Sequence, residues 1–139
     1  MGKTRIIRSL VLDASALTEA AREASQLRIQ VRRVASRGAS LYTTAATLTE
    51  VLRGKSTDVP VHRLLDSLNV QVVDQHVGRA AGERIGRTRT RGNSTLDTLD
   101  AIVAEVASSL PRPVAVLTAD TKDLTVLVDP DVMVLDIAV

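Results

Sequence analysis

The sequence contains no cysteine, phenylalanine or tryptophan, and Tyr42 is its only aromatic residue. Without cysteine there is no disulfide framework, no thiolate metal site and no thiol nucleophile, and a reducing compartment suits the chain. Without a row of aromatic rings, the protein cannot hold single-stranded nucleic acid by stacking bases on its side chains. The sequence also lacks a long uncharged run and an apolar signal segment, so we expect a cytoplasmic protein with no membrane contact.

The positive and negative charges are nearly balanced. The 139 residues include 18 Lys and Arg and 16 Asp and Glu, which gives a net charge of +2. Any attraction for nucleic acid must therefore come from the arrangement of charge rather than from its total. A chain of this length is most simply one domain, residues 1–139, which can bury a core without help from a cofactor.

Short apolar segments rich in β-branched residues alternate with longer segments of helical periodicity. The apolar segments predict strands at 9–12, 41–44, 70–73, 114–118 and 132–135. The periodic segments predict helices at 15–36 with one break, 45–54 with Gly54 as the stop, 60–68, 76–88 and 95–110. Residues 87–94 have weak signals and are expected to be a loop. This alternation favours an α/β fold with a mostly parallel five-stranded sheet and helices on both faces.

Two aspartates each follow a predicted strand. Asp13 comes directly after residues 9–12, and Asp120 follows residues 114–118 after one alanine. In an open parallel sheet, ligands bind at the carboxyl ends of strands, where the strand order reverses. Each residue is also a good candidate for a helix N-cap, because aspartate is among the strongest N-cap residues and a helix is expected after each. Both interpretations stay open from sequence alone.

Two further carboxylates lie in predicted helices. Glu50 is near the apolar stripe of its helix, and Asp100 lies within the stripe of the helix at 95–110. A buried carboxylate without a partner is costly or shifts its pKa, so a cation is its natural partner. For Glu50 the alternative partner is a basic side chain such as Arg53. Asp97, three residues before Asp100, either joins the cluster or complements the dipole in the first helical turn.

Four carboxylates from two strand ends and two helices form the oxygen-rich donor set that Mg²⁺ or Mn²⁺ prefers. The two histidines do not add to this set. His62 and His76 have no spacing that indicates zinc ligation, and each is expected at the surface or in a turn.

The segments VLDASAL, TLTEVLRG, LDAIVAEVA and LTADTKDL, in this order, resemble the PIN-domain family, and specifically the VapC-like toxins of bacterial toxin–antitoxin pairs. The resemblance covers essentially the whole chain. It implies a three-layer α/β/α sandwich and a Mg²⁺- or Mn²⁺-dependent ribonuclease that leaves a 5′-phosphate. Family members are often homodimers and are held inactive by a cognate antitoxin.

The family's acidic quartet matches four positions of this chain: Asp13, Glu50, Asp100 and Asp120. Asp123 matches a further acidic position of the last motif, and Ser15 and Thr118 match hydroxyl residues beside the site. The chain departs from the pattern at Leu124, where an aromatic residue often follows the aspartate. This departure concerns packing rather than chemistry.

An acidic site needs a separate basic rim to hold RNA. The candidates lie just before the helix of Asp100, and they are Arg84, Arg87, Arg89 and Arg91. A solvated charged face is the alternative for them. A second basic segment, from Arg22 to Arg37, can face solvent or a partner.

Three other functions fit the same residues less well. A haloacid-dehalogenase-type phosphatase needs an aspartate where Ser15 stands. A phospho-receiver domain needs paired acids near the N-terminus to accompany an aspartate such as Asp74, and this chain lacks them. The third alternative is a catalytically idle PIN-like module that binds RNA or protein, and the retained acidic quartet argues against it.

Overall fold

The computed structural model describes residues 6–89 and 97–138. Five strands form one sheet in the order β3-β2-β1-β4-β5, and all four pairs of neighbouring strands are parallel. The strands are β1 (Ser9–Leu12), β2 (Ser40–Thr44), β3 (Asn69–Gln71), β4 (Val114–Thr118) and β5 (Met133–Asp136).

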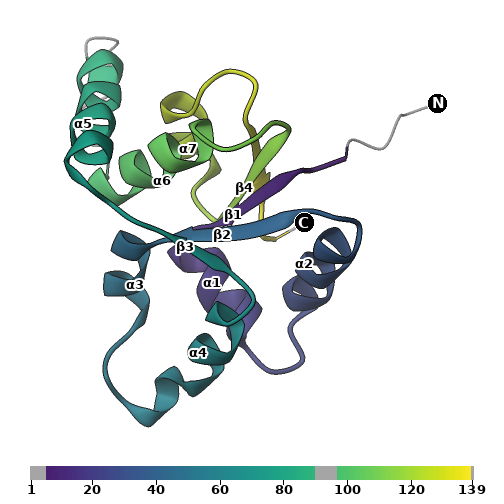
Figure 1. Ribbon diagram of the computed structural model, residues 1–139. Coiled ribbons are helices and arrows are strands. Elements are labelled where there is room, and N and C mark those ends of the chain that lie inside the picture. The colour runs from purple at the N-terminus through teal and green to yellow at the C-terminus, as the bar shows by residue number, and fades with distance from the viewer. Residues whose placement is uncertain (1–5, 90–96, 139) are drawn as a thin grey trace.

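Helices cover both faces of this sheet. They are α1 (Ala14–Ala21), α2 (Gln26–Ser36), α3 (Ala45–Val51), α4 (Val59–Leu65), α5 (Gln75–Arg89), α6 (Thr98–Ser108) and α7 (Thr121–Leu127), with a short 3-10 turn at Ser56–Asp58. Helices α1 to α4 lie on one side and α5 to α7 on the other (Figure 1). The three-layer α/β/α architecture is therefore confirmed. No described helix is both long enough and apolar enough to cross a membrane.

The central strands are buried because both of their faces are covered. Every residue of β1 and β4 is buried, whereas the edge strand β5 has half-buried and exposed positions. One apolar cluster joins Val11 and Val116 of the sheet to α6 and α7, and another joins Leu10 and Leu12 to α1 and α2. Continuous apolar runs in the sequence thus mark strands that lie inside the sandwich.

Most predicted boundaries are confirmed within one or two residues, and several differ. The helix predicted at 60–68 ends at Leu65, and the helix predicted at 95–110 begins at Thr98. The helix expected to stop at Gly54 ends at Val51, and Gly54 instead takes a positive φ of 73° in the following turn. The predicted strand at 70–73 is shortened to three residues. Helix α5 continues through Arg89, into the segment expected to be a loop, and the rest of that segment (90–94) lies outside the described residues.

The strand order reverses between β1 and β4. From β1 the chain steps outward to β2 and β3, and after α6 it returns to the other side of β1 as β4 and continues to β5. The carboxyl ends of β1 and β4 therefore lie side by side, each followed by the N-terminus of a helix. This is the position at which open α/β sheets bind ligands.

Candidate active site

Asp13 lies at the carboxyl end of β1 and caps helix α1. Its side chain is 6% exposed, and its Oδ1 accepts hydrogen bonds from the Ala16 backbone N–H at 3.0 Å and from Ser15 Oγ at 2.7 Å. The N-cap interpretation is thus confirmed for Asp13. Both bonds are made by one carboxylate oxygen, and Oδ2 takes no part in either of them.

Asp120 occupies the equivalent position after β4 but behaves differently. It is the residue before α7, yet its side chain makes no capping hydrogen bond. Its backbone N–H instead donates to Thr118 Oγ1 at 2.8 Å, and its side chain is exposed. The N-cap interpretation therefore fails for Asp120, and its carboxylate is left for another role.

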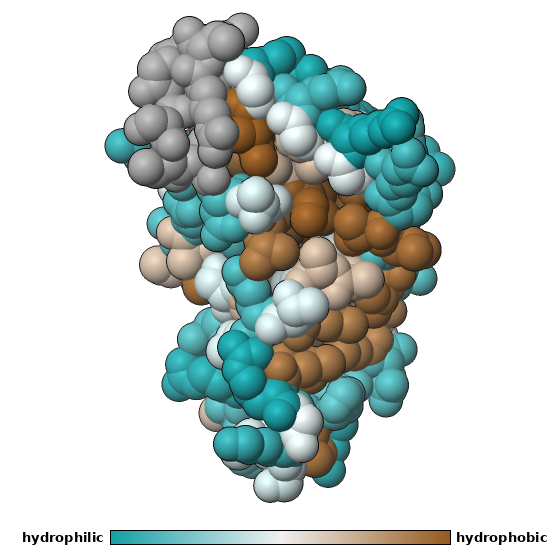
Figure 2. All heavy atoms as spheres, turned by 90° about the vertical axis from the view of Figure 1, so that its left-hand side faces the viewer, coloured by the Kyte–Doolittle hydropathy of each residue, from teal (hydrophilic) through white to brown (hydrophobic). Residues whose placement is uncertain are grey.

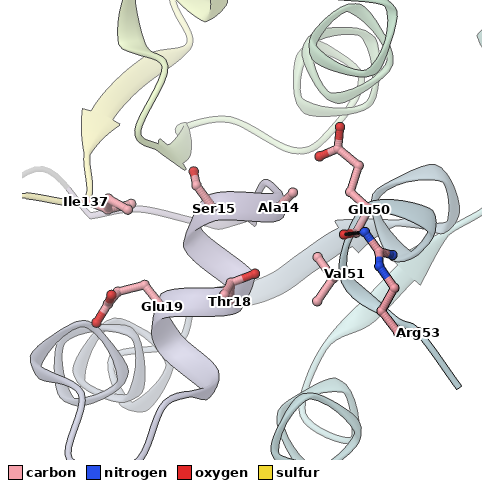
Figure 3. Close-up of a pocket in the computed structure, with 8 residues that line it drawn as sticks. All are labelled: Ala14, Ser15, Thr18, Glu19, Glu50, Val51, Arg53 and Ile137. Carbon is pink, nitrogen blue, oxygen red and sulfur yellow. Dashed lines mark hydrogen bonds between the residues drawn. The ribbon is translucent and has the colours of Figure 1, made fainter. Parts of the chain in front are cut away.

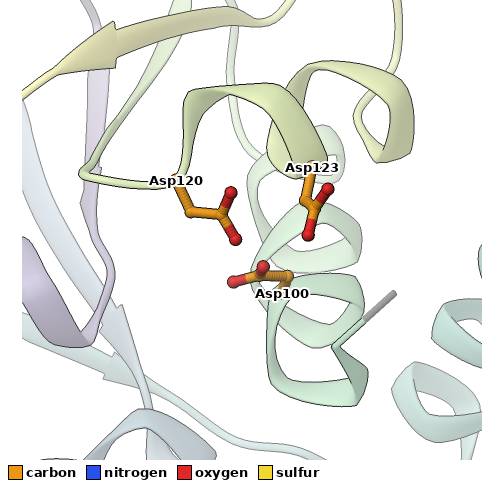
Figure 4. Close-up of side chains that lie close together, drawn as sticks. All are labelled: Asp100, Asp120 and Asp123. Carbon is orange, nitrogen blue, oxygen red and sulfur yellow. The ribbon is translucent and has the colours of Figure 1, made fainter. Parts of the chain in front are cut away.

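Three aspartates form a compact cluster at this edge of the sheet. Asp100 lies in the first turn of α6, Asp120 precedes α7, and Asp123 lies in the first turn of α7. One carboxylate oxygen from each lies within 4.8 Å of the others, and Figure 4 shows the three carboxylates converging. The cluster unites two members of the predicted quartet with Asp123, which the sequence marked as secondary. Asp120 lies just before α7 and Asp123 in its first turn, and this spacing of three residues is the sequence signal that places them close together.

Asp100 is the most perturbed member of the cluster. Its Oδ2 is buried without a hydrogen-bond partner, the one side-chain atom in this condition among the residues described. Burial, together with a hydrogen bond and the charge from Asp120, raises the pKa of Asp100 to about 8. Burial and then the Asp120 charge also raise the pKa of Asp123. Without a cation, the cluster must hold a proton to relieve this repulsion.

The donor set of this cluster fits a hard divalent cation. All of its ligand atoms are carboxylate oxygens, and Mg²⁺ and Mn²⁺ prefer such oxygen ligands over softer ones. The buried, unpartnered oxygen of Asp100 is the position at which a cation would replace the missing hydrogen-bond donor. The residues present therefore match a metal site.

Glu50 stands at the rim of the site rather than in its centre. The prediction placed it near the buried stripe of its helix, but its side chain is exposed on the face of α3 that is turned to solvent. Partial burial, and next the charges of Asp97 and Asp13, raise the pKa of Glu50. The Glu50 carboxylate thus lies within the electrostatic field of the cluster.

Arg53 is not the partner of the Glu50 side chain. Its guanidinium donates to the backbone carbonyls of Thr49, Glu50 and Leu52, at the carboxyl end of α3. Figure 3 shows the Glu50 carboxylate directed away from that guanidinium. Both residues line an open pocket of about 560 Å³ that begins at the N-terminus of α1 and also includes Ser15.

Asp97 caps helix α6. Its Oδ1 accepts a hydrogen bond from the Leu99 backbone N–H at 2.8 Å, and its side chain is exposed. After burial, its charge is the next cause of the raised pKa of Glu50. Asp97 therefore starts the helix and also adds negative charge to the site.

The expectation that Arg84 contacts RNA is wrong. Its side chain is only 11% exposed, and its guanidinium donates to Glu105 Oε1 at 2.9 Å and to Asp129 Oδ1 at 3.0 Å. The solvated-face alternative is wrong for the same reason. Arg84 is part of the scaffold, because it joins α5 to α6 and to the segment after α7.

The other basic candidates have different environments. Arg87 is exposed in the last turn of α5; the side chain of Arg89 and all of Arg91 lie outside the described residues. In the second basic segment, Arg22 pairs with Glu19, and Arg28 donates to three carbonyls at the end of α1. The remaining members are exposed, namely Arg32, Arg33 and Arg37, as are His62 and His76.

Comparison with known proteins identifies the family and similar folds. Residues 10–125 match the PIN domain family. The fold is similar to VapBC2 from Rickettsia felis bound to a promoter DNA fragment (TM-score 0.73, 12% identity, 92% of this chain and 98% of that chain). It is also similar to DNA-bound VapBC from Salmonella typhimurium (TM-score 0.70, 17% identity, 94% of this chain and 99% of that chain). A third similar structure is FitAcB from Neisseria gonorrhoeae (TM-score 0.65, 21% identity, 93% of this chain and 98% of that chain). No curated protein matches the sequence. The chain belongs to the PIN-domain family.

Proposed function

We propose that this protein is a Mg²⁺- or Mn²⁺-dependent endoribonuclease and the toxin of a toxin–antitoxin pair. One observation carries the proposal: the buried Oδ2 of Asp100 has no partner inside a cluster of three carboxylates. That cluster lies at the strand-order reversal of a PIN-family sheet. A site of this kind is costly to build unless a cation completes it.

In this proposal the carboxylates hold metal and do not transfer protons. Asp100, Asp120 and Asp123 supply the central oxygens, Asp13 supplies Oδ2 from the neighbouring strand end, and Glu50 supplies a carboxylate from the rim. When bound, a divalent cation activates water as a nucleophile and offsets charge on the scissile phosphate. A phosphodiester fits this site when a cation is bound, because its anionic oxygens can then contact the cation. Without the cation, the carboxylates of the cluster would repel them.

Hydrogen bonds help to orient two of these ligands, Asp13 and Asp120. The Ala16 N–H holds Asp13 from the start of α1, and the Thr118 hydroxyl holds the backbone of Asp120, whose side chain is then free of a capping bond. Ligands placed on the ends of rigid strands and helices are better fixed than ligands on loops. This placement orients a bound phosphodiester without any movement of the sheet.

The partner in this proposal is a small antitoxin. The fold is similar to VapBC and FitAB complexes, and the sequence resembles the VapC-like toxins of such pairs. A cluster of carboxylates without a cation attracts an inserted Arg or Lys side chain, which gives an antitoxin a direct means of inhibition. We also propose that the protein forms a homodimer, as its relatives often do.

Cleavage of RNA by purified, antitoxin-free protein tests the activity. We expect cleavage of total RNA with Mg²⁺ or Mn²⁺, none in EDTA, and recovery when the metal is restored. Asp100→Asn is the matched control, because it keeps the shape of the side chain and removes its charge. Undiminished cleavage in EDTA would contradict the metal mechanism, and metal-independent RNA binding without cleavage would favour the idle binding module.

Co-expression tests the toxin assignment separately. We expect expression of the wild-type protein to arrest growth, and expression of the adjacent small reading frame to relieve the arrest and yield a co-purifying complex. Asp100→Asn should be non-toxic and should still co-purify. Failure of both rescue and co-purification would leave the nuclease without a toxin role.

A further inference from the structure

We infer that Ser15 is a positioning residue, whose hydroxyl both orients the Asp13 carboxylate and ties the carboxyl end of β1 to that of β4. The effect on metal binding rests on the proposed function, whereas the tie between the strand ends does not. Ser15 lies in the first turn of α1, half-buried, at the edge of the open pocket beside the site (Figure 3).

The Ser15 hydroxyl makes two hydrogen bonds that complement each other. It donates to Asp13 Oδ1 at 2.7 Å and accepts from the Ala119 backbone N–H at 2.9 Å. The second bond joins residues 104 positions apart in the chain. One side chain therefore connects the aspartate after β1 to the residue that precedes Asp120.

This tie lies beyond the ladder of the sheet. The last register pair between β1 and β4 is Leu12 with Leu117, and the Asp13 N–H donates to the Leu117 carbonyl at 3.3 Å. After these residues the chain enters α1 on one face of the sheet and α7 on the other. The Ser15–Ala119 hydrogen bond therefore connects the two chain segments beyond the sheet, next to Asp13 and Asp120.

The same contacts select which oxygen of Asp13 faces the site. Oδ1 accepts from both Ser15 Oγ and the Ala16 N–H, so the carboxylate plane is fixed by two donors. Oδ2 is then the oxygen left for a cation. Hydrogen bonds that hold ligating carboxylates typically change metal affinity by about 10- to 100-fold when they are removed.

Metal titration with three variants tests the positioning role. Ser15→Ala removes one of the two donors to Asp13, whereas Ser15→Thr keeps a hydroxyl, and its methyl group has room beside the open pocket. Ser25→Ala is the matched control: Ser25 caps α2 by accepting from the Arg28 N–H at 3.2 Å, beyond the far end of α1. We expect Mn²⁺ affinity, measured by calorimetry, to fall about 10-fold or more in Ser15→Ala. Ser15→Thr should recover most of it, and Ser25→Ala should match the wild type.

Amide hydrogen exchange tests the tie without any metal. In metal-free protein we expect the Ala119 amide to exchange faster in Ser15→Ala than in the wild type or in Ser25→Ala, because its acceptor is gone. Unchanged Ala119 exchange, or Mn²⁺ affinity equal in Ser15→Ala and Ser25→Ala, would overturn the inference, as would no rescue by threonine. If the wild type itself binds no Mn²⁺, the proposed function fails, and Ala119 exchange still decides whether Ser15 ties the strand ends.

Discussion

Helix α6 carries two acidic residues whose surroundings are opposite. Asp100, in its first turn, belongs to a cluster of three carboxylates, and no ion pair is made to it within residues 6–89 and 97–138. Glu105, five residues later, accepts from Arg84 at 2.9 Å and from Ser109 Oγ at 3.1 Å. The same helix therefore presents one acid that is satisfied by protein and one that is not.

The satisfied acid belongs to a network of arginines and carboxylates. Arg84 contacts Glu105 and Asp129, and Arg112 contacts Asp129 and Asp131. We call these five residues the paired network. Its hydrogen bond from Arg112 lowers the pKa of Asp131, whereas burial and Asp120 raise the pKa of Asp100.

The difference shows what each group is built to do. In the paired network each acid contacts an arginine, and these ion pairs connect α5 and α6 to the segment after α7. Where three acids lie together with no ion pair to them among the described residues, a cation from outside the chain can supply the opposing charge. The comparison predicts that the paired network controls stability and that the aspartate cluster controls metal binding.

The largest expected effect is on stability, in Arg84→Met. Removing the shared cation leaves the buried Glu105 without its ion pair and Asp129 with Arg112 alone, and breaking a buried pair in this way costs about 3–5 kcal/mol. Urea unfolding measures the loss. Metal affinity of the folded fraction should be unchanged. If Arg84→Met does not fold, the milder Glu105→Gln measures the same pair, and a loss below about 1 kcal/mol in either variant would contradict a structural role.

The second effect is on activity, in Asp100→Asn. Cleavage and Mn²⁺ affinity should fall by more than about 100-fold, because loss of a ligand exceeds loss of the groups that support one. In metal-free protein the variant should be about as stable as the wild type below the raised pKa of Asp100, about 8, where that residue is protonated. Above that pKa it should be more stable, since one of three clustered charges is removed. Glu105→Gln, on the same helix, is the control, with the reverse pattern of lower stability and retained cleavage. Equal activity in the two variants would remove the distinction between the clusters.

The sequence predicted the fold well because its signals were local and strong. Unbroken apolar runs marked β1 and β4. Asp13 directly after β1 and Asp120 one residue beyond β4 marked the two strand ends that meet at the order reversal. Asp100 was predicted correctly as an acid within an apolar stripe. These inferences need only the periodicity of a helix or strand and the general placement of ligands in parallel sheets.

The errors arose where the answer depends on distant residues. Arg84 pairs with acids 21 and 45 positions away, so its spacing within a basic stretch could not reveal that it is buried. Glu50 lies on a helix of only seven residues, in which two or three apolar neighbours do not define the buried face. Whether Asp13 and Asp120 cap their helices also depended on local geometry, and the two differ.

The third prediction concerns pH and follows from the raised pKa of Asp100, about 8. In metal-free protein, folding favours the protonated form of Asp100, because its pKa is higher in the folded than in the unfolded state. Its contribution to the free energy of unfolding is therefore complete below about pH 4, the pKa of the unfolded state. The contribution is lost as pH rises through the folded pKa of about 8. Unfolding of chelated protein at pH 5, 6, 7 and 8 should therefore show falling stability, and the fall should be smaller in Asp100→Asn.

Metal binding should show the opposite pH trend, because the cation requires the ionised carboxylate. If one proton leaves on binding, Mn²⁺ affinity should rise by about 10-fold per pH unit below the folded pKa and level off above it. Asp129→Asn, in the paired network, is the control and should keep the wild-type slope. A pH-independent affinity in the wild type would show that Asp100 is already ionised in the metal-free protein.

The smallest expected effect is on RNA binding, in a variant with Arg87, Arg89 and Arg91 replaced by glutamine. Arg84 belongs to the paired network and is excluded from the set. Each lost phosphate contact lowers the salt dependence of single-strand binding by about 0.7, so three contacts lower the slope by about two units. Binding to an uncleaved RNA at several salt concentrations, in the Asp100→Asn background, measures this slope.

A second triple variant locates the basic surface. Arg32, Arg33 and Arg37 are also exposed and follow one another along α2, on the face of the sheet that α1 to α4 cover (Figure 1). Figure 2 shows another side of the molecule, where apolar side chains form a patch bordered by hydrophilic ones. If phosphate contacts come from the end of α5 and the segment that follows it, the salt dependence of RNA binding should fall only in the variant of Arg87, Arg89 and Arg91. Loss in the α2 variant alone would place the RNA on the opposite helical layer, with the arginines near α5 facing solvent.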